Sequence, residues 1–137
     1  DYDVRGKRFA VWGLAFKPNT DDTREAPALY VIDQLLAHGA IVSAYDPEAM
    51  PNVQRLYEGQ ERLRLCETPY QATLDADALL ITTEWNAFRT PDFARLSKEL
   101  RAKVIFDGRN VYDPADPAEW GFYYESIGRK TVDNRQQ

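Results

Sequence analysis

Short apolar runs alternate with amphipathic segments along most of the chain. Three runs, at residues 8–13, 40–45 and 78–82, are β-prone and have the length of buried strands. Between the first two runs, leucine and isoleucine recur at helical spacing from Pro27 to His38, and Gly39 follows as a helix stop signal. The pattern predicts a strand, a helix and a second strand in the first third of the chain.

The remaining two thirds repeat this alternation less regularly. The expected segments are a helix within 48–59, a strand at 63–66, a short helix at 68–74 with Thr68 as N-cap, a polar and aromatic loop at 83–89, a helix opened by Pro91, a strand at 103–107 and a last strand around 122–124. We expect residues 129–137 to be a polar, disordered tail that follows a single domain at 1–128.

Strands separated by helices are typical of a mainly parallel sheet with helices on both faces. We therefore predict an α/β, Rossmann-like, doubly wound fold. Ligands of such sheets bind beyond the carboxyl ends of the strands, where the strand order reverses, usually between the first and fourth strands. This rule selects the loops after Gly13, Thr82 and Asp107 as candidate ligand loops.

Composition narrows the classes of function. A chain of 137 residues with 44% hydrophobic residues can bury the core of one domain. A net charge of -5 makes nucleic acid and membrane surfaces poor partners. The single cysteine, Cys66, and the single histidine, His38, exclude a disulfide and a zinc site built from several such residues, and they suit a reducing cytoplasm.

The chain has no apolar run of about 18 residues, the length that a membrane helix needs. Its start, at Asp1–Arg5, has neither a signal-peptide pattern nor an initiator methionine. We therefore expect a soluble, cytoplasmic fragment of a longer protein.

The loop after the first predicted strand lacks the Gly-x-Gly-x-x-Gly pattern of dinucleotide sites. Gly13 allows a turn, but Ala15 and Phe16 carry side chains where a pyrophosphate requires close approach of the backbone. Lys17 instead offers a point charge to a phosphate near a helix N-terminus. The alternative for Lys17 is an ordinary solvated side chain.

Acidic residues and an arginine follow in the same loop. Asp21 and Asp22 have two interpretations: ligands of a divalent metal together with Glu25, or acids near a helix N-terminus. We favour the second, because Arg24 would compete with a metal ion. Arg24 itself can pair with these acids or offer its fork to a phosphate.

A second candidate cation follows the strand at 103–107. Gly108 permits an unusual turn, and Arg109 beside it can bind a phosphate through two nitrogen atoms. The alternative is an ion pair of Arg109 with Asp107 or Asp113. Lys17 and Arg109 both follow strand ends, so we expect them to converge on one place.

Four other conspicuous residues have ordinary structural interpretations. We expect Trp85 and Phe88 to be part of the core rather than a base-stacking platform. Cys66 is expected to be a small buried apolar residue, and His38 a surface residue at a helix C-terminus.

Four motifs occur in a fixed order: GLAFKPNTDDTREAP at 13–27, YDP at 45–47, TEWNAF at 83–88 and FDGRN at 106–110. Together they resemble the C-terminal, UDP-binding domain of UDP-glucose 6-dehydrogenases, within the UDP-glucose/GDP-mannose dehydrogenase family. The resemblance covers nearly all of residues 4–127.

The resemblance implies an oxidoreductase that converts UDP-glucose to UDP-glucuronate in two NAD-dependent steps. It also implies an N-terminal NAD-binding domain and a central helical domain, and a homodimer for the full-length protein. The catalytic cysteine of this family precedes the UDP-binding domain, so the fragment alone is expected to be inactive and to contain no catalytic residue.

By motif, Phe16, Lys17 and Arg109 resemble the residues of this family that bind the UDP-sugar. Arg24 resembles the residue that reaches the NAD across the cleft between domains. Other readings remain open: the UDP-binding domain of a UDP-N-acetylmannosamine or GDP-mannose dehydrogenase, a non-enzymatic nucleotide-binding or dimerisation module, or a receiver-like module. A receiver module would need acids directly after the first strand, an aspartate after the third and a lysine after the fifth, and this chain has none of these at those positions.

Overall fold

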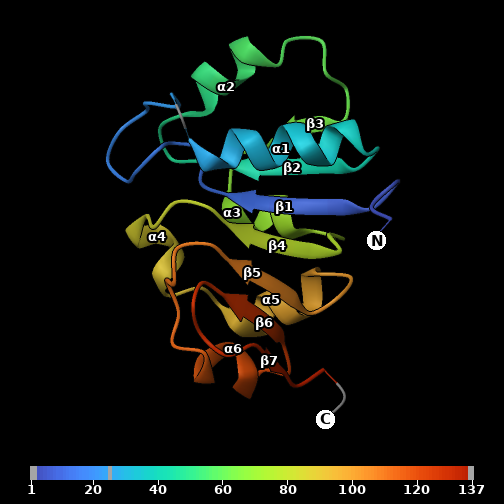
Figure 1. Cartoon of the computed structure of the whole chain (residues 1–137), viewed down its shortest axis with the longest axis vertical. Coiled ribbons are helices and arrows are strands. Elements are labelled where there is room, and N and C mark those ends of the chain that lie inside the picture. The colour runs from blue at the N-terminus through green and yellow to red at the C-terminus, as the bar shows by residue number, and fades with distance from the viewer. Residues whose placement is uncertain (1–2, 25, 136–137) are drawn as a thin grey trace.

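The chain folds into a seven-stranded sheet with helices on both faces (Figure 1). The computed structural model describes residues 3–24 and 26–135. The strands are β1 (Arg8–Trp12), β2 (Ile41–Tyr45), β3 (Leu63–Leu65), β4 (Ala78–Ile81), β5 (Val104–Asp107), β6 (Tyr123–Ser126) and β7 (Val132–Asp133). The helices are α1 (Pro27–Ala37), α2 (Met50–Leu56), α3 (Pro69–Thr73), α4 (Asn86–Arg89), α5 (Phe93–Glu99) and α6 (Ala115–Glu119). The predicted α/β, doubly wound architecture is confirmed.

The strand order is β3-β2-β1-β4-β5-β6-β7, and only β6 and β7 pair antiparallel. β1 lies between β2 and β4, with Phe9 in register with Val42 on one side and Ala78 on the other. The strand order therefore reverses between β1 and β4, as predicted. All the parallel strands end at the same side, on the left in Figure 1, which we call the carboxyl end of the sheet.

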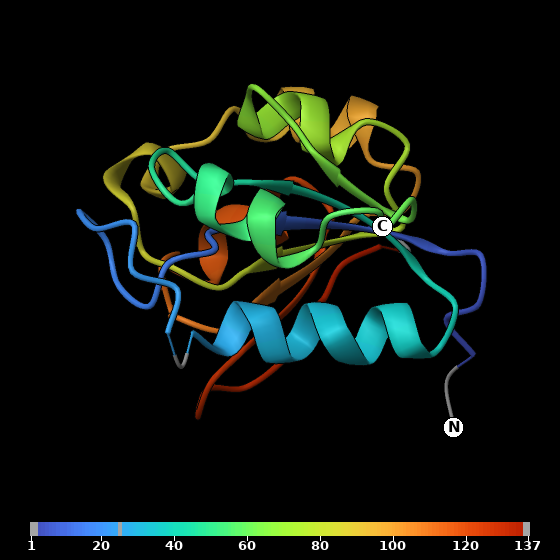
Figure 2. The ribbon, with the colours of Figure 1, turned by 90° about the horizontal axis from the view of Figure 1, so that it is seen from above.

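Successive side chains of β1 belong to different layers of the core, one on each face of the sheet. Ala10 and Trp12 belong to a cluster that includes residues of α3 and α5, whereas Val11 packs with residues of α1 and α2. Figure 2 shows α1 on one face of the sheet, with α3 and α5 on the other. The predicted core role of the aromatic loop residues is confirmed: Trp85 is buried, and Phe88 stacks on Trp12 with 5.2 Å between ring centroids.

Three local features differ from the sequence-based expectation. The loop expected at 83–89 contains α4, which buries Phe88. α5 begins at Phe93 rather than at Pro91, because the Asp92 side chain accepts a hydrogen bond from the Arg95 backbone N–H and forms the N-cap. α6 was not expected, since a five-residue helix is too short to show an apolar period, and α6 has no side-chain N-cap like the one that identified α3.

The segment after β6 is more ordered than the polar tail expected at 129–137. β7 lies within it and pairs with β6. Asn134 donates a hydrogen bond to the Ala118 carbonyl oxygen at 2.9 Å, and Arg129 donates to the Tyr124 hydroxyl at 2.8 Å. Polar contacts to the body of the domain thus replace apolar burial here. The last two residues lie outside the described part of the chain, and the domain boundary itself stays a prediction.

Candidate functional site

Four loops meet at the carboxyl end of the sheet, after β1, β2, β4 and β5. The loop after β1 spans residues 13–26, and Figure 2 shows it projecting beyond the N-terminal end of α1. The loops after β2, β4 and β5 contact residues 13–16, at the start of this loop. The following contacts fix their relative positions.

Gly13 allows the loops after β1 and β4 to touch. Its φ of +105° lies in the region that favours glycine, and a Cβ at this position would lie 2.5 Å from the Thr83 side chain. The Thr83 hydroxyl donates a hydrogen bond to the Ala15 carbonyl oxygen at 2.7 Å, and the Thr82 hydroxyl donates to the Gly13 carbonyl oxygen at 2.5 Å. The two loops therefore have a fixed spacing.

Asp46, directly after β2, is fully buried and binds three of the loops together. Its Oδ2 accepts hydrogen bonds from the Leu14 and Ala15 backbone N–H groups at 2.7 and 3.1 Å, and from the Trp85 indole at 3.1 Å. Its Oδ1 accepts from the Glu48 and Ala49 N–H groups, both at 2.8 Å. This carboxyl group fixes the backbone at the start of the loop after β1.

Asp107, at the end of β5, has the same role in the fourth loop. It is 1% exposed, and its oxygens accept hydrogen bonds from the N–H groups of Arg109, Val111 and Tyr112. The Tyr124 hydroxyl donates a further hydrogen bond at 2.6 Å. Burial and this hydrogen bond raise the pKa of Tyr124, so its hydroxyl stays protonated and remains a donor.

Arg109 crosses from the loop after β5 to the loops after β4 and β1. Its Nε donates to Glu84 Oε1 at 3.0 Å, and its Nη2 donates to the Phe16 carbonyl oxygen at 3.1 Å. The alternative ion pairs with Asp107 or Asp113 are not formed by the guanidinium in the described structure; only the Arg109 backbone N–H bonds to Asp107. Arg109 and Phe16, expected at one site, are thus brought together.

Phe16 and Lys17 lie in the projecting part of the loop after β1. Phe16 is 47% exposed, and its N–H donates to the Asp22 carbonyl oxygen at 2.8 Å, which closes the loop on itself. Lys17 is exposed and has no hydrogen bond or ion pair with the described residues. Its ammonium group is therefore available to a ligand.

Arg24 takes the internal pairing that the sequence left open. Its Nε and Nη2 each donate to an Asp22 carboxylate oxygen at 3.0 Å, and these hydrogen bonds lower the pKa of Asp22 to about 2. The Arg24 side chain is nevertheless 87% exposed. Asp22 is thus structural, and no group of three or more metal-binding side chains occurs among the described residues. Glu25, the third ligand considered for a metal, lies outside them.

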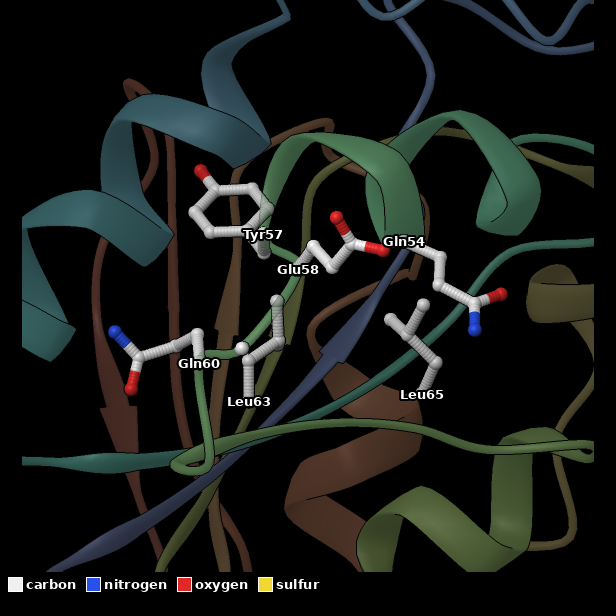
Figure 3. Close-up of a pocket in the computed structure, with 7 residues that line it drawn as sticks. Gln54, Tyr57, Glu58, Gln60, Leu63 and Leu65 are labelled. Carbon is white, nitrogen blue, oxygen red and sulfur yellow. The ribbon is translucent and has the colours of Figure 1, made fainter.

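A separate hollow of about 390 Å³ lies between the end of α2 and the edge strand β3 (Figure 3). It is lined by Gln54, Tyr57, Glu58, Gly59, Gln60, Leu63 and Leu65. None of these residues carries a positive charge, and Glu58 carries a negative one. The hollow therefore does not suit an anion, and it shares no residue with the four loops.

Sequence reasoning missed Asp46 and Glu84 as parts of this arrangement and treated Asp107 only as an ion-pair partner. A carboxylate at the end of a predicted parallel strand or directly after it, as in Asp107 and Asp46, is the signal that could have found two of them. Glu84 has no such signal, because its partner Arg109 is 25 residues away in the sequence.

No helix in residues 3–24 and 26–135 is long and apolar enough to cross a membrane.

Residues 10–114 match the model of the UDP-glucose/GDP-mannose dehydrogenase family, UDP binding domain.

Two curated relatives and one solved structure share this similarity. The chain is 49% identical over 127 residues to a UDP-glucose 6-dehydrogenase of Rhizobium meliloti (strain 1021), a match that covers 93% of the chain and 28% of the relative. It is 48% identical to a UDP-glucose 6-dehydrogenase of Pseudomonas aeruginosa over 91% of the chain and 28% of the relative. A UDP-glucose dehydrogenase structure from the archaeon Pyrobaculum islandicum superposes with a TM-score of 0.76 and 32% identity, over 93% of the chain and 27% of the neighbour.

Proposed function

Because the chain belongs to the UDP-glucose/GDP-mannose dehydrogenase family and matches its UDP binding domain, we propose that Phe16, Lys17 and Arg109 hold the diphosphate of a UDP-sugar. The chain spans about 28% of the length of the curated relatives it matches. The proposed activity of the whole protein is the NAD-dependent oxidation of UDP-glucose to UDP-glucuronate.

The observation that carries this proposal is that two loops, each with a cationic residue, meet at the carboxyl end of the sheet. Arg109 contacts the Phe16 carbonyl oxygen, and Lys17 is the next residue along the chain. A diphosphate is a doubly charged group that favours several charged donors held close together. Doubly wound sheets bind their ligands at this position.

The chain contributes binding and orientation to this reaction rather than catalytic groups. Its single cysteine, Cys66, directly follows β3 and is buried in the apolar cluster that contains Ala10 and Trp12 of β1, and burial raises the pKa of the thiol. A thiol with a raised pKa is a poor nucleophile. We therefore propose that the isolated chain binds the nucleotide without oxidising its sugar.

The loop after β1 does not fit a complete NAD site. The Leu14 and Ala15 N–H groups, which would face a pyrophosphate in a dinucleotide-binding turn, already donate to Asp46. We propose that the exposed Arg24 side chain contacts NAD and that the rest of the longer protein holds most of the cofactor. We also propose that the full-length protein is a homodimer located in the cytoplasm.

Titration of UDP, UMP and GDP into the 137-residue chain by isothermal calorimetry tests the proposal. We expect UDP to bind more tightly than UMP or inorganic phosphate, and Lys17→Ala and Arg109→Ala each to weaken UDP about tenfold, the loss of one charged hydrogen bond. Preference for GDP would indicate a GDP-sugar as the ligand. If UDP bound no better than phosphate, or if both variants kept the wild-type affinity, the proposed site would be wrong.

A further inference from the structure

Glu84 is the one acidic side chain bonded to the Arg109 guanidinium among the described residues. Its Oε1 lies 3.0 Å from Arg109 Nε, and the two side chains are only 33% and 28% exposed. Partial burial strengthens such a pair relative to one in open solvent. The contact therefore restricts the guanidinium more than a surface ion pair would.

Two of the three guanidinium nitrogens of Arg109 have partners within the described residues. Nε and Nη2 donate to Glu84 and to the Phe16 carbonyl oxygen, while Nη1 has no hydrogen bond to any residue in the described part of the chain. The Nη1–Nη2 edge thus retains N–H groups that can bind two oxygens of a phosphate. Without Glu84, the long Arg109 side chain could rotate and present this edge in other directions.

The backbones on both sides of the pair are themselves held in place. The Thr83 hydroxyl bonds to the Ala15 carbonyl oxygen beside Glu84, and the Gly108 N–H bonds to the Ile81 carbonyl oxygen at 2.9 Å beside Arg109. Both ends of the ion pair therefore start from fixed positions. A side chain oriented before binding loses less conformational entropy when it binds a ligand.

We propose that Glu84 is a positioning residue: by accepting the Nε hydrogen bond it directs the Nη1–Nη2 edge of Arg109 toward the nucleotide diphosphate. This inference rests on the proposed UDP site. Glu84 acts through Arg109 and does not itself touch the ligand, since its carboxylate and the diphosphate are both negatively charged and repel each other.

Calorimetric titration of UDP into Glu84→Ala and Glu84→Gln chains tests the proposal. The alanine variant should bind UDP about tenfold more weakly, whereas the glutamine variant, whose amide oxygen can still accept from Nε, should stay within about threefold of wild type. Glu48→Ala removes the same charge from the neighbouring loop and serves as the control for long-range electrostatics. Equal loss in both Glu84 variants, or tighter binding in both, would overturn the proposal.

A double variant separates this inference from the proposed function. In an Arg109→Ala background, Glu84→Ala should have no further effect on UDP affinity, because its partner is gone. The Arg109 Nε–H resonance in ¹H–¹⁵N spectra should also move in Glu84→Ala and stay near its wild-type position in Glu84→Gln. If Arg109→Ala weakened UDP binding while Glu84→Ala did not, only the positioning role would fail. If neither Arg109→Ala nor Lys17→Ala had an effect, the UDP site itself would fail.

Discussion

Charged groups of two kinds share the carboxyl end of the sheet and have opposite environments. Asp46 and Asp107 are buried, and several N–H or O–H groups of the domain donate hydrogen bonds to each. Lys17 and Arg24 are exposed, on a loop that projects beyond the sheet. The buried carboxyl groups fix the backbone of the loops, and the exposed cations extend from that backbone.

This difference separates stability from binding. Removing a buried acceptor leaves several donors without partners inside the protein, which destabilises the fold. Removing an exposed cation leaves the fold intact and changes only what the site can bind. Substitutions in the two regions should therefore have different consequences, and the following predictions test that.

The largest effect is expected for Asp46→Ala. The substitution leaves four backbone N–H groups and the Trp85 indole without their acceptor. The free energy of unfolding should fall by about 3–5 kcal/mol, as for other broken buried networks. Urea denaturation monitored by tryptophan fluorescence measures this change.

The exposed carboxylate Glu61 provides the control for Asp46. Glu61→Ala should change the free energy of unfolding by less than about 0.5 kcal/mol, as is usual for surface substitutions. Similar values for the two alanine variants would show that Asp46 does not support the loops.

The next largest effect is expected for Gly13→Ala, measured against Gly59→Ala. Both glycines have positive φ, +105° and +85°, but only at Gly13 would a Cβ meet a neighbour, at 2.5 Å from Thr83. Thermal unfolding should give a loss of about 3–4 kcal/mol for Gly13→Ala and about 1 kcal/mol for Gly59→Ala, since steric overlap adds to backbone strain only at the first site. Equal losses would mean that the loops after β1 and β4 can separate freely.

The smallest effect concerns the ion pair of the exposed loop. Hydrogen bonds from Arg24 lower the pKa of Asp22 from 3.8 to about 2, so the carboxylate contributes stability above pH 3.8 and loses it as the pH falls through about 2. NMR titration of the Asp22 carboxyl carbon should give a midpoint near 2, and Arg24→Ala should return it toward 3.8. A wild-type midpoint near 3.8 would contradict the pairing.

Most of the fold could be predicted from the sequence because its signals are local. Apolar runs mark β1, β2 and β4, and the reversal of strand order follows from the general topology of doubly wound sheets. α4 and α6 could not be predicted, because neither has a side-chain N-cap like the Thr68 cap of the equally short α3, and β7 is only two residues long. Such short elements depend on contacts with the rest of the domain rather than on a pattern of their own.

The candidate site could be predicted only in part. Positions after strand ends selected Lys17 and Arg109, and the convergence of their loops is observed. Neither Asp107 nor Asp113, the ion-pair partners considered for Arg109, is the observed one. The observed partner, Glu84, lies on a loop that is distant in the sequence. The five donors to Asp46 come together only when three loops meet, which a linear pattern does not reveal.

The place where UDP binds tests the central claim most directly. We predict that ¹H–¹⁵N spectra of the chain titrated with UDP will show the largest amide shifts in residues 14–17, at Glu84 and in residues 108–110. Shifts centred on residues 54–65, around the hollow beside β3, would contradict the account, as would the absence of any shift at saturating UDP.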